Sequence, residues 1–148
     1  LSALAASGLP PERLELEITE TVLMKNNEAS LAALRRLRTL GVRLAMDDFG
    51  TGYSSLSYLH SFPIDKIKID RSFTMRLGEN AEGEAIVRAI LVLAARLGIA
   101  TTAEGVETER QLAFLRQEGC TEAQGYLISP PKPVRDALAL APDAAAAA

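Results

Sequence analysis

Several classes of protein are excluded by what this sequence lacks. Of its 148 residues one is histidine, none is tryptophan and one, Cys120, is cysteine, so no internal disulfide can form and a reducing cytoplasm is expected. Its 16 basic side chains are fewer than its 19 acidic ones, so no basic excess indicates a nucleic-acid polymer as partner. No apolar run approaches the roughly 18 residues of a membrane span. We expect a cytoplasmic domain, whose parent chain could still be tethered to a membrane through other segments.

The two ends of the sequence predict a fragment of a longer parent chain. The first residue is Leu1 rather than a methionine, and residues 1–8 are typical of the last turns of a helix that ends at Gly8. Residues 134–148 are rich in alanine and offer little to pack, so we predict a C-terminal tail there. Residues 1–133 are then expected to be the C-terminal part of a single domain.

Between these ends one pattern recurs: an amphipathic segment stops at a glycine, and a short apolar strand follows. Glycine just beyond a helix is the usual C-terminal cap, and helices that alternate with short strands are typical of βα units with a parallel sheet. We therefore predict an α/β fold with five parallel strands. The helices are expected over 30–40, 84–97 and 109–118, and the strands over 13–19, 42–48, 65–70, 99–105 and 120–126.

Polar and apolar residues alternate along the predicted strands, which assigns their side chains to two faces. In the third predicted strand, Ile67 and Ile69 share one face. Lys66, Lys68 and Asp70 share the other. Because helices normally cover the outside of a parallel sheet, the polar face should line the interior of a barrel, with its charges near the C-terminal mouth.

Polar side chains stand at or near the carboxyl end of every predicted strand, so four carboxylates, one lysine and one amide should converge at this mouth. An acid in such a position is by itself more often a helix cap or a solvated charge, but converging carboxylates are costly unless a cation lies among them. Oxygen ligands suit Mg²⁺ or Mn²⁺ rather than zinc. The converging residues are Glu17, Asp47, Asp48, Lys68, Glu104 and Gln124.

The adjacent pair Asp47 and Asp48 indicates a site for two metal ions. One carboxylate can bridge two ions while its neighbour binds only one, as in two-metal phosphoryl chemistry. Lys68 would then supply a cation for a phosphate or a metal-bound hydroxide. The segment that follows, FGTGYSS with Gly50 and Gly52, is either a loop over the site or an ordinary glycine turn, and the glycines alone favour the turn.

Five motifs carry a resemblance to a known family. ELEITE, DDFGTGYSSL, IDKIKIDRSF, TTAEGVET and EAQGYLISPP resemble the later motifs of the EAL domain in order and spacing, over about residues 1–133. The resemblance implies the later five βα units of a modified TIM (β/α)8 barrel. It also implies the activity of the family's cyclic di-GMP phosphodiesterases, which is metal-dependent hydrolysis of one phosphodiester bond to give linear pGpG.

The same resemblance implies a metal site with two Mg²⁺ or Mn²⁺ ions. Glu17 and Asp47 would bind one ion. Asp47 would bridge it to a second ion, which Asp48 also binds.

Catalytic and supporting roles follow from the resemblance as well. Lys68 would contact the attacking water or the scissile phosphate. Glu104 would act as a general base or bind the second metal through water, and Gln124 would position that network. Residues that would anchor the glycine loop or support the site from behind are Glu20, Glu107, Gly50, Gly52 and Asp70.

Parts of the family's pattern are not found in the sequence. The Glu-Ala-Leu motif is absent, because Glu84, Ala85 and Ile86 lie within a helical pattern, and an asparagine metal ligand would precede Leu1. Pro130 stands where many members carry Arg or Lys. The resemblance therefore implies an active parent domain and an inactive fragment. The unpaired strand edges of this fragment should be covered either by the missing strands as a separate segment or by pairing between two copies, and a homodimer is expected.

Two other functions stay open. A degenerate EAL domain would bind cyclic di-GMP without cleaving it, as a receptor or regulatory module, and the missing first half could lack a ligand. A barrel lyase or racemase of the enolase kind also places acids and lysines around Mg²⁺, although the adjacent aspartates and the glycine loop favour phosphodiester chemistry. The expected partners are cyclic di-GMP, a second copy of the chain, and a GGDEF or sensor domain in the parent chain.

Overall fold

The computed structural model describes residues 2–19, 22, 28–50, 59, 61–78, 81–133 and 136. In them, five parallel strands form one sheet, and each strand pairs with the next along the chain. This sequential order is that of a barrel sheet, whereas a doubly wound sheet reverses its order at a switch point. The prediction of five parallel strands is confirmed. The strands are β1 (Glu15–Thr19), β2 (Arg43–Phe49), β3 (Lys66–Ile69), β4 (Ala100–Ala103) and β5 (Glu122–Ala123).

Helices connect β1 to β2, β3 to β4 and β4 to β5, and several end at the predicted glycines. Gly41, Gly98 and Gly119 have φ values of 93°, 69° and 80°, the left-handed conformation that a helix C-terminal cap needs and that glycine adopts without a steric cost. The helix over Glu109–Gln117 begins with a capping box, in which Thr108 and Gln111 bond each other's backbone N–H groups. The helical segments are α1 (Ser2–Ser7), η1 (Pro11–Arg13), α3 (Glu28–Thr39), α5 (Arg71–Thr74), α6 (Ala81–Leu97) and α7 (Glu109–Gln117).

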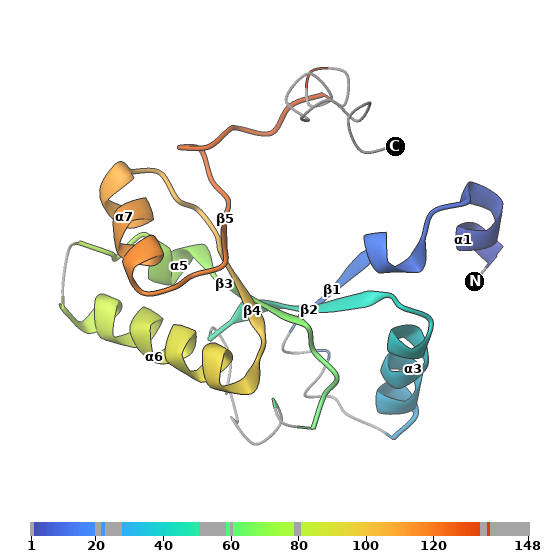
Figure 1. Cartoon of the computed structure of the whole chain (residues 1–148). Coiled ribbons are helices and arrows are strands. Elements are labelled where there is room, and N and C mark those ends of the chain that lie inside the picture. Colours follow the sequence, from blue (N-terminus) through green and yellow to red (C-terminus); the bar gives the residue numbers. More distant parts are fainter. Residues whose placement is uncertain are drawn as a thin grey trace.

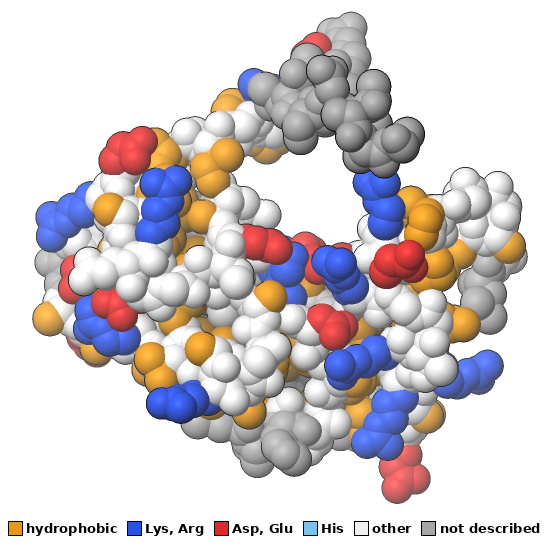
Figure 2. Space-filling model, viewed as in Figure 1, with side chains coloured by type: hydrophobic (Ala, Val, Ile, Leu, Met, Phe, Trp, Pro, Cys, Tyr) orange, Lys and Arg blue, Asp and Glu red, His pale blue; other side chains and the backbone are white. Residues whose placement is uncertain are grey.

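The sheet has one apolar and one polar face, as the alternation predicts. Leu44, Ile67 and Ile69 are fully buried, and they belong to one core together with Leu34 of α3 and Val87 of α6. Figure 1 shows α3 and α6 on the same side of the sheet, while the other side is not covered by a helix of the described chain. On that side, Figure 2 shows acidic and basic side chains gathered along the floor of a hollow. The polar face therefore carries the groups available for chemistry.

Among the described residues, the structure contains no helix with the length and apolar character needed to cross a membrane.

Candidate metal centre

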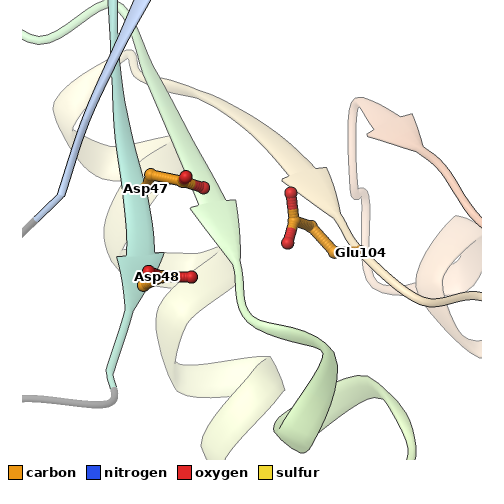
Figure 3. A group of neighbouring side chains, drawn as sticks. All are labelled: Asp47, Asp48 and Glu104. Carbon is orange, nitrogen blue, oxygen red and sulfur yellow. The ribbon is translucent and has the colours of Figure 1, made fainter.

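The two adjacent aspartates lie in a β-bulge at the end of β2. A regular strand would point neighbouring side chains to opposite faces. Here the pairing with β3 advances three residues on β2, from Met46 to Phe49, while it advances only two on β3. The strand accommodates the extra residue with Asp48 at φ 54°, a left-handed conformation that aspartate adopts more readily than most residues. Both carboxylates consequently point to the side on which Glu104 lies (Figure 3).

Asp47, Asp48 and Glu104 form an acidic cluster in which one oxygen of each carboxylate lies within 4.8 Å of the others. Glu104 directly follows β4, and its backbone N–H donates to the carbonyl oxygen of Ile69 at 3.1 Å. This bond extends the pairing of β3 and β4 by one step and fixes where the Glu104 side chain starts. The bulge and the strand pairing together produce the cluster.

Lys68 lies between three carboxylates on the polar face. Its Nζ is 2.8 Å from Glu17 Oε1, 2.9 Å from Asp47 Oδ1 and 2.8 Å from Glu104 Oε1, and 8% of its side chain is exposed. Burial lowers the pKa of the ammonium group, but the contacts with Glu104, Glu17 and Asp47 outweigh it and raise the pKa above its ordinary value. Lys68 is therefore charged at neutral pH. We call Glu17, Asp47, Lys68 and Glu104 the mouth layer.

Gln124 joins the mouth layer through Glu104. Its Nε2 donates to Glu104 Oε1 at 3.0 Å, and its backbone N–H donates to the carbonyl oxygen of Ala103 at 2.9 Å. The next residue, Gly125, lies so close to Val106 that a Cβ atom would overlap the Val106 backbone. A glycine is thus required for β5 to approach β4 and bring Gln124 to Glu104. All six residues predicted to converge do lie together.

Two of the predicted supporting residues contact α5 or its start. Asp70 Oδ1 accepts a hydrogen bond from the Ser72 backbone at 3.0 Å and caps this helix. Burial raises the pKa of Asp70, but the bonds from Ser72 outweigh it and leave the pKa below its ordinary value. Gly50, at φ 94°, follows the bulge, and a Cβ atom there would lie 2.9 Å from the Phe73 ring. Asp70 and Gly50 thus shape the backbone beside the site.

Glu107, in contrast, has no ion pair with Lys68 among the described residues. It is exposed and lines a cavity of about 560 Å³ beside the mouth layer. Glu20 and Gly52, predicted to anchor or form the loop, lie outside the described residues. The residues that line the cavity are Arg71, Glu104, Gly105, Glu107, Gln124, Gly125, Tyr126, Ser129 and Pro131.

A second ion-pair layer lies closer to the amino ends of the strands, and it was not predicted. Lys66 Nζ is 3.0 Å from Glu15 Oε2 and 2.7 Å from Glu122 Oε2. Thr102 Oγ1 donates to the same Glu122 oxygen at 2.9 Å. We call Glu15, Lys66 and Glu122 the inner layer. A signal that could have predicted this layer is the two-residue spacing of like charges on β1 and on β3. Glu122 has the same spacing, because it precedes Gln124 by two residues.

The donor set at the mouth fits a hard divalent cation. All the acidic groups supply oxygen, and the Asp47–Asp48–Glu104 cluster has the spacing that a shared cation requires. Oδ1 of Asp47 is buried, and its 2.9 Å contact with Lys68 is an ion pair without hydrogen-bond geometry. That oxygen therefore keeps a lone pair that a metal ion could use. The ions that suit such a site are Mg²⁺, Mn²⁺ and Ca²⁺.

The family is established by comparison. The model of the EAL domain matches residues 1–131, so the chain belongs to the EAL domain family. It contains the later five βα units of that family's TIM-barrel-like fold.

The chain is similar to a protein named cyclic di-GMP phosphodiesterase NbdA, from Pseudomonas aeruginosa. It is 50% identical over 132 residues, which are 89% of this chain and 17% of NbdA. The chain therefore spans less than a fifth of this relative's length.

Two solved structures are similar to the chain. The phosphodiesterase MucR of P. aeruginosa in complex with c-di-GMP has a TM-score of 0.87 and 44% identity, with 92% of this chain and 55% of that one covered. BlrP1 of Klebsiella pneumoniae, in a manganese and cyclic di-GMP complex, has a TM-score of 0.79 and 38% identity, with 85% and 32% covered. BlrP1 is also known in a calcium complex.

Proposed function

We propose that this chain is part of a metal-dependent phosphodiesterase that hydrolyses cyclic di-GMP to linear pGpG within a longer parent protein. The observation that carries the proposal is the bulge at the end of β2. It turns two adjacent aspartates to one side, where they meet Glu104 beside a charged lysine. A strained backbone that gathers like charges is costly, and such costs are concentrated at functional sites.

The mouth layer, together with Asp48 and Gln124, supplies the groups this reaction needs. Glu17, Asp47 and Asp48 would hold two ions, Mg²⁺ or Mn²⁺, and these would activate water and neutralise phosphate charge. Lys68 and Gln124 both contact Oε1 of Glu104. Their contacts orient this carboxylate and leave Oε2 to accept the proton of the attacking water. Gln124 is then a positioning residue, and Lys68 is placed to meet a phosphate oxygen.

Further parts of the proposal concern the parent protein. We propose that it acts in the cytoplasm as a homodimer, with a GGDEF or sensor domain in the same chain. Glu20 would tether the loop that follows β2, the segment to which Gly52 belongs. Changing Glu20 to alanine should lower turnover while the thermal unfolding midpoint is unchanged, and unchanged kinetics would return Glu20 to the status of a surface acid.

The central test is the substitution Asp47→Asn in the full-length protein. Asp47 would hold both ions, so removing its charge should lower cyclic di-GMP turnover at least about a hundredfold, more than the loss typical of residues behind the metal ligands. The product pGpG would be measured by chromatography with and without Mg²⁺ or Mn²⁺. The acid-to-amide control is Glu12→Gln, because Glu12 is exposed and lies in η1, before the start of β1. Near-normal turnover by Asp47→Asn would refute the two-metal site. Tight cyclic di-GMP binding by the wild type without turnover would favour the receptor function.

A further inference from the structure

The mouth layer holds a cation of its own, the ammonium group of Lys68. Three carboxylates surround this group at 2.8 to 2.9 Å, and only 8% of the lysine side chain is exposed. Two of the three, Glu17 and Asp47, are also residues proposed above to hold a metal ion. The same two side chains are thus offered to two different cations.

A metal ion and the Lys68 ammonium group cannot both bind the same carboxylate oxygens at their normal distances. A divalent ion such as Mg²⁺ binds carboxylate oxygen at about 2.1 Å, whereas Lys68 Nζ already lies 2.8 Å from Glu17 Oε1 and 2.9 Å from Asp47 Oδ1. A metal ion on those oxygens would meet the ammonium charge within a few ångströms. Water screens this repulsion least between Lys68 and Asp47, whose side chains are only 8% and 22% exposed. Without any cation, the three carboxylates would repel each other. One of the two cations must therefore be present, and each weakens the other.

We propose that Lys68 is an internal counter-ion that competes with the metal for Glu17 and Asp47. Before metal binds, the ammonium group holds the acids together on the polar face. When metal binds, Lys68 leaves Glu17 and Asp47 and keeps its contact with Glu104. Lys68 thereby becomes available to an anionic phosphate in the neighbouring cavity only after the metal is in place. This inference rests on the proposed function, because it uses the same metal ligands.

The inner layer offers a matched control for this competition. Lys66 lies on the same strand and the same face, and it is also paired with two carboxylates, Glu15 and Glu122. Neither of these acids belongs to the Asp47–Asp48–Glu104 cluster. Removing the charge of Lys66 should therefore leave metal binding unchanged.

The first experiment is a calorimetric titration of the full-length protein with Mn²⁺ alone. We compare the wild type with Lys68→Gln and Lys66→Gln, since glutamine keeps polar contacts but removes the charge. Lys68→Gln should bind Mn²⁺ about tenfold more tightly, a typical size for coupling between two ligands, and Lys66→Gln should stay within about twofold of the wild type. Equal or weaker binding by Lys68→Gln would overturn the proposal. A wild type that binds no Mn²⁺ would instead refute the metal site itself.

A second measurement needs no variant and stays decisive if Lys68→Gln does not fold. The wild-type protein is exposed briefly to an amine-acylating reagent with and without saturating Mg²⁺, and the modification of each lysine is read by mass spectrometry. Lys68 should become at least about threefold more reactive when Mg²⁺ is present, because its contacts with Glu17 and Asp47 are lost, while Lys66 should not change. An unchanged ratio of Lys68 to Lys66 labelling would show that the metal and Lys68 do not compete.

Discussion

The inner and mouth layers are built around two lysines on the same strand, and they differ in how their charges balance. In the inner layer, Glu15 and Glu122 are matched by Lys66 and by Arg43, whose charge also acts on Glu122. In the mouth layer, Lys68 faces three carboxylates in direct contact, and a fourth, Asp48, lies within the same acidic cluster.

This difference separates a structural ion-pair layer from a binding site. A layer whose charges cancel needs no further partner, and it can stabilise the interior of the barrel by itself. A layer with an excess of negative charge is costly unless a cation joins it. Figure 3 shows that the two aspartates of the bulge point to the side on which Glu104 lies, which is where the negative charge gathers. The charge balance of each layer, rather than the presence of acids, indicates its role.

The largest expected effect comes from the same change made in each layer. Glu104→Gln should lower cyclic di-GMP turnover on the order of a thousandfold, since the proposed general base is lost, and such groups contribute roughly 10²- to 10⁴-fold. Glu122→Gln should leave turnover within about twofold, because the hydrogen bonds of the Glu122 carboxylate go to Lys66 and Thr102 and none reaches the mouth layer among the described residues. Steady-state kinetics on the full-length protein would measure both. Equal losses would show that the layers are not functionally distinct.

A second test compares two glycines that precede or follow these layers. Gly105 follows Glu104 at φ 67°, and a Cβ atom there would lie 2.7 Å from Cβ of Arg71. Gly119, at φ 80°, lies before β5, and no atom would lie within 4 Å of its added Cβ. Gly105→Ala should cost about 3 kcal/mol of folding free energy, from the left-handed backbone and the overlap, whereas Gly119→Ala should cost about 1 kcal/mol from the backbone alone.

Denaturant unfolding would measure both costs, and turnover provides a second readout. A displaced Glu104 should also slow catalysis in Gly105→Ala, while Gly119→Ala should retain it. Similar stability for the two variants would mean that Arg71 moves aside without cost. The close contact at Gly105 would then not fix the mouth layer.

The sequence predicts the layers only in part, for physical reasons. The strands are predictable because glycine caps and alternation are local signals, and the convergence of acids is predictable because the ends of parallel strands meet. The bulge is not, since period two assigns Asp48 to the face opposite Asp47, and only the pairing with β3 reveals the extra residue. Which carboxylates pair with Lys66 and which with Lys68 depends on the register of strands that are far apart in sequence. The convergence around Lys68 was therefore predictable, but its individual ion pairs were not.

A smaller effect is expected when the inner layer loses its cation. Lys66→Met should lower the free energy of unfolding by about 1 kcal/mol, because Glu15 and Glu122 lose a partner that is itself largely buried, but both acids keep access to water. Arg76→Met is the control, since Arg76 is exposed and has no ion pair with the described residues. Chemical denaturation of both variants measures the difference. A loss equal to that of the control would mean that the inner layer adds no stability.

The smallest effect is the pH dependence of the inner layer. The hydrogen bond from Lys66 holds the pKa of Glu122 below its ordinary value of 4.5, and it outweighs the burial that raises this pKa. Burial lowers the pKa of Lys66, but Glu122 and Glu15 raise it above 10.5. The ion pair therefore contributes its full stability between pH 4.5 and pH 10.5, the ordinary pKa values of the two groups. It is lost as pH falls through the depressed pKa of Glu122, or as pH rises through the raised pKa of Lys66.

Glu122→Gln makes this dependence measurable. The variant should be less stable than the wild type by a few tenths of a kcal/mol at neutral pH, a small value because 52% of the Glu122 side chain is exposed. At a pH below the depressed pKa of Glu122 this difference should shrink toward zero, because the wild-type carboxyl is then protonated and resembles the amide. Urea unfolding at both pH values would test it. A difference that stays constant would assign the stability to the hydrogen bond from Thr102 rather than to charge, and the inner layer would no longer be an ion-pair layer in energetic terms.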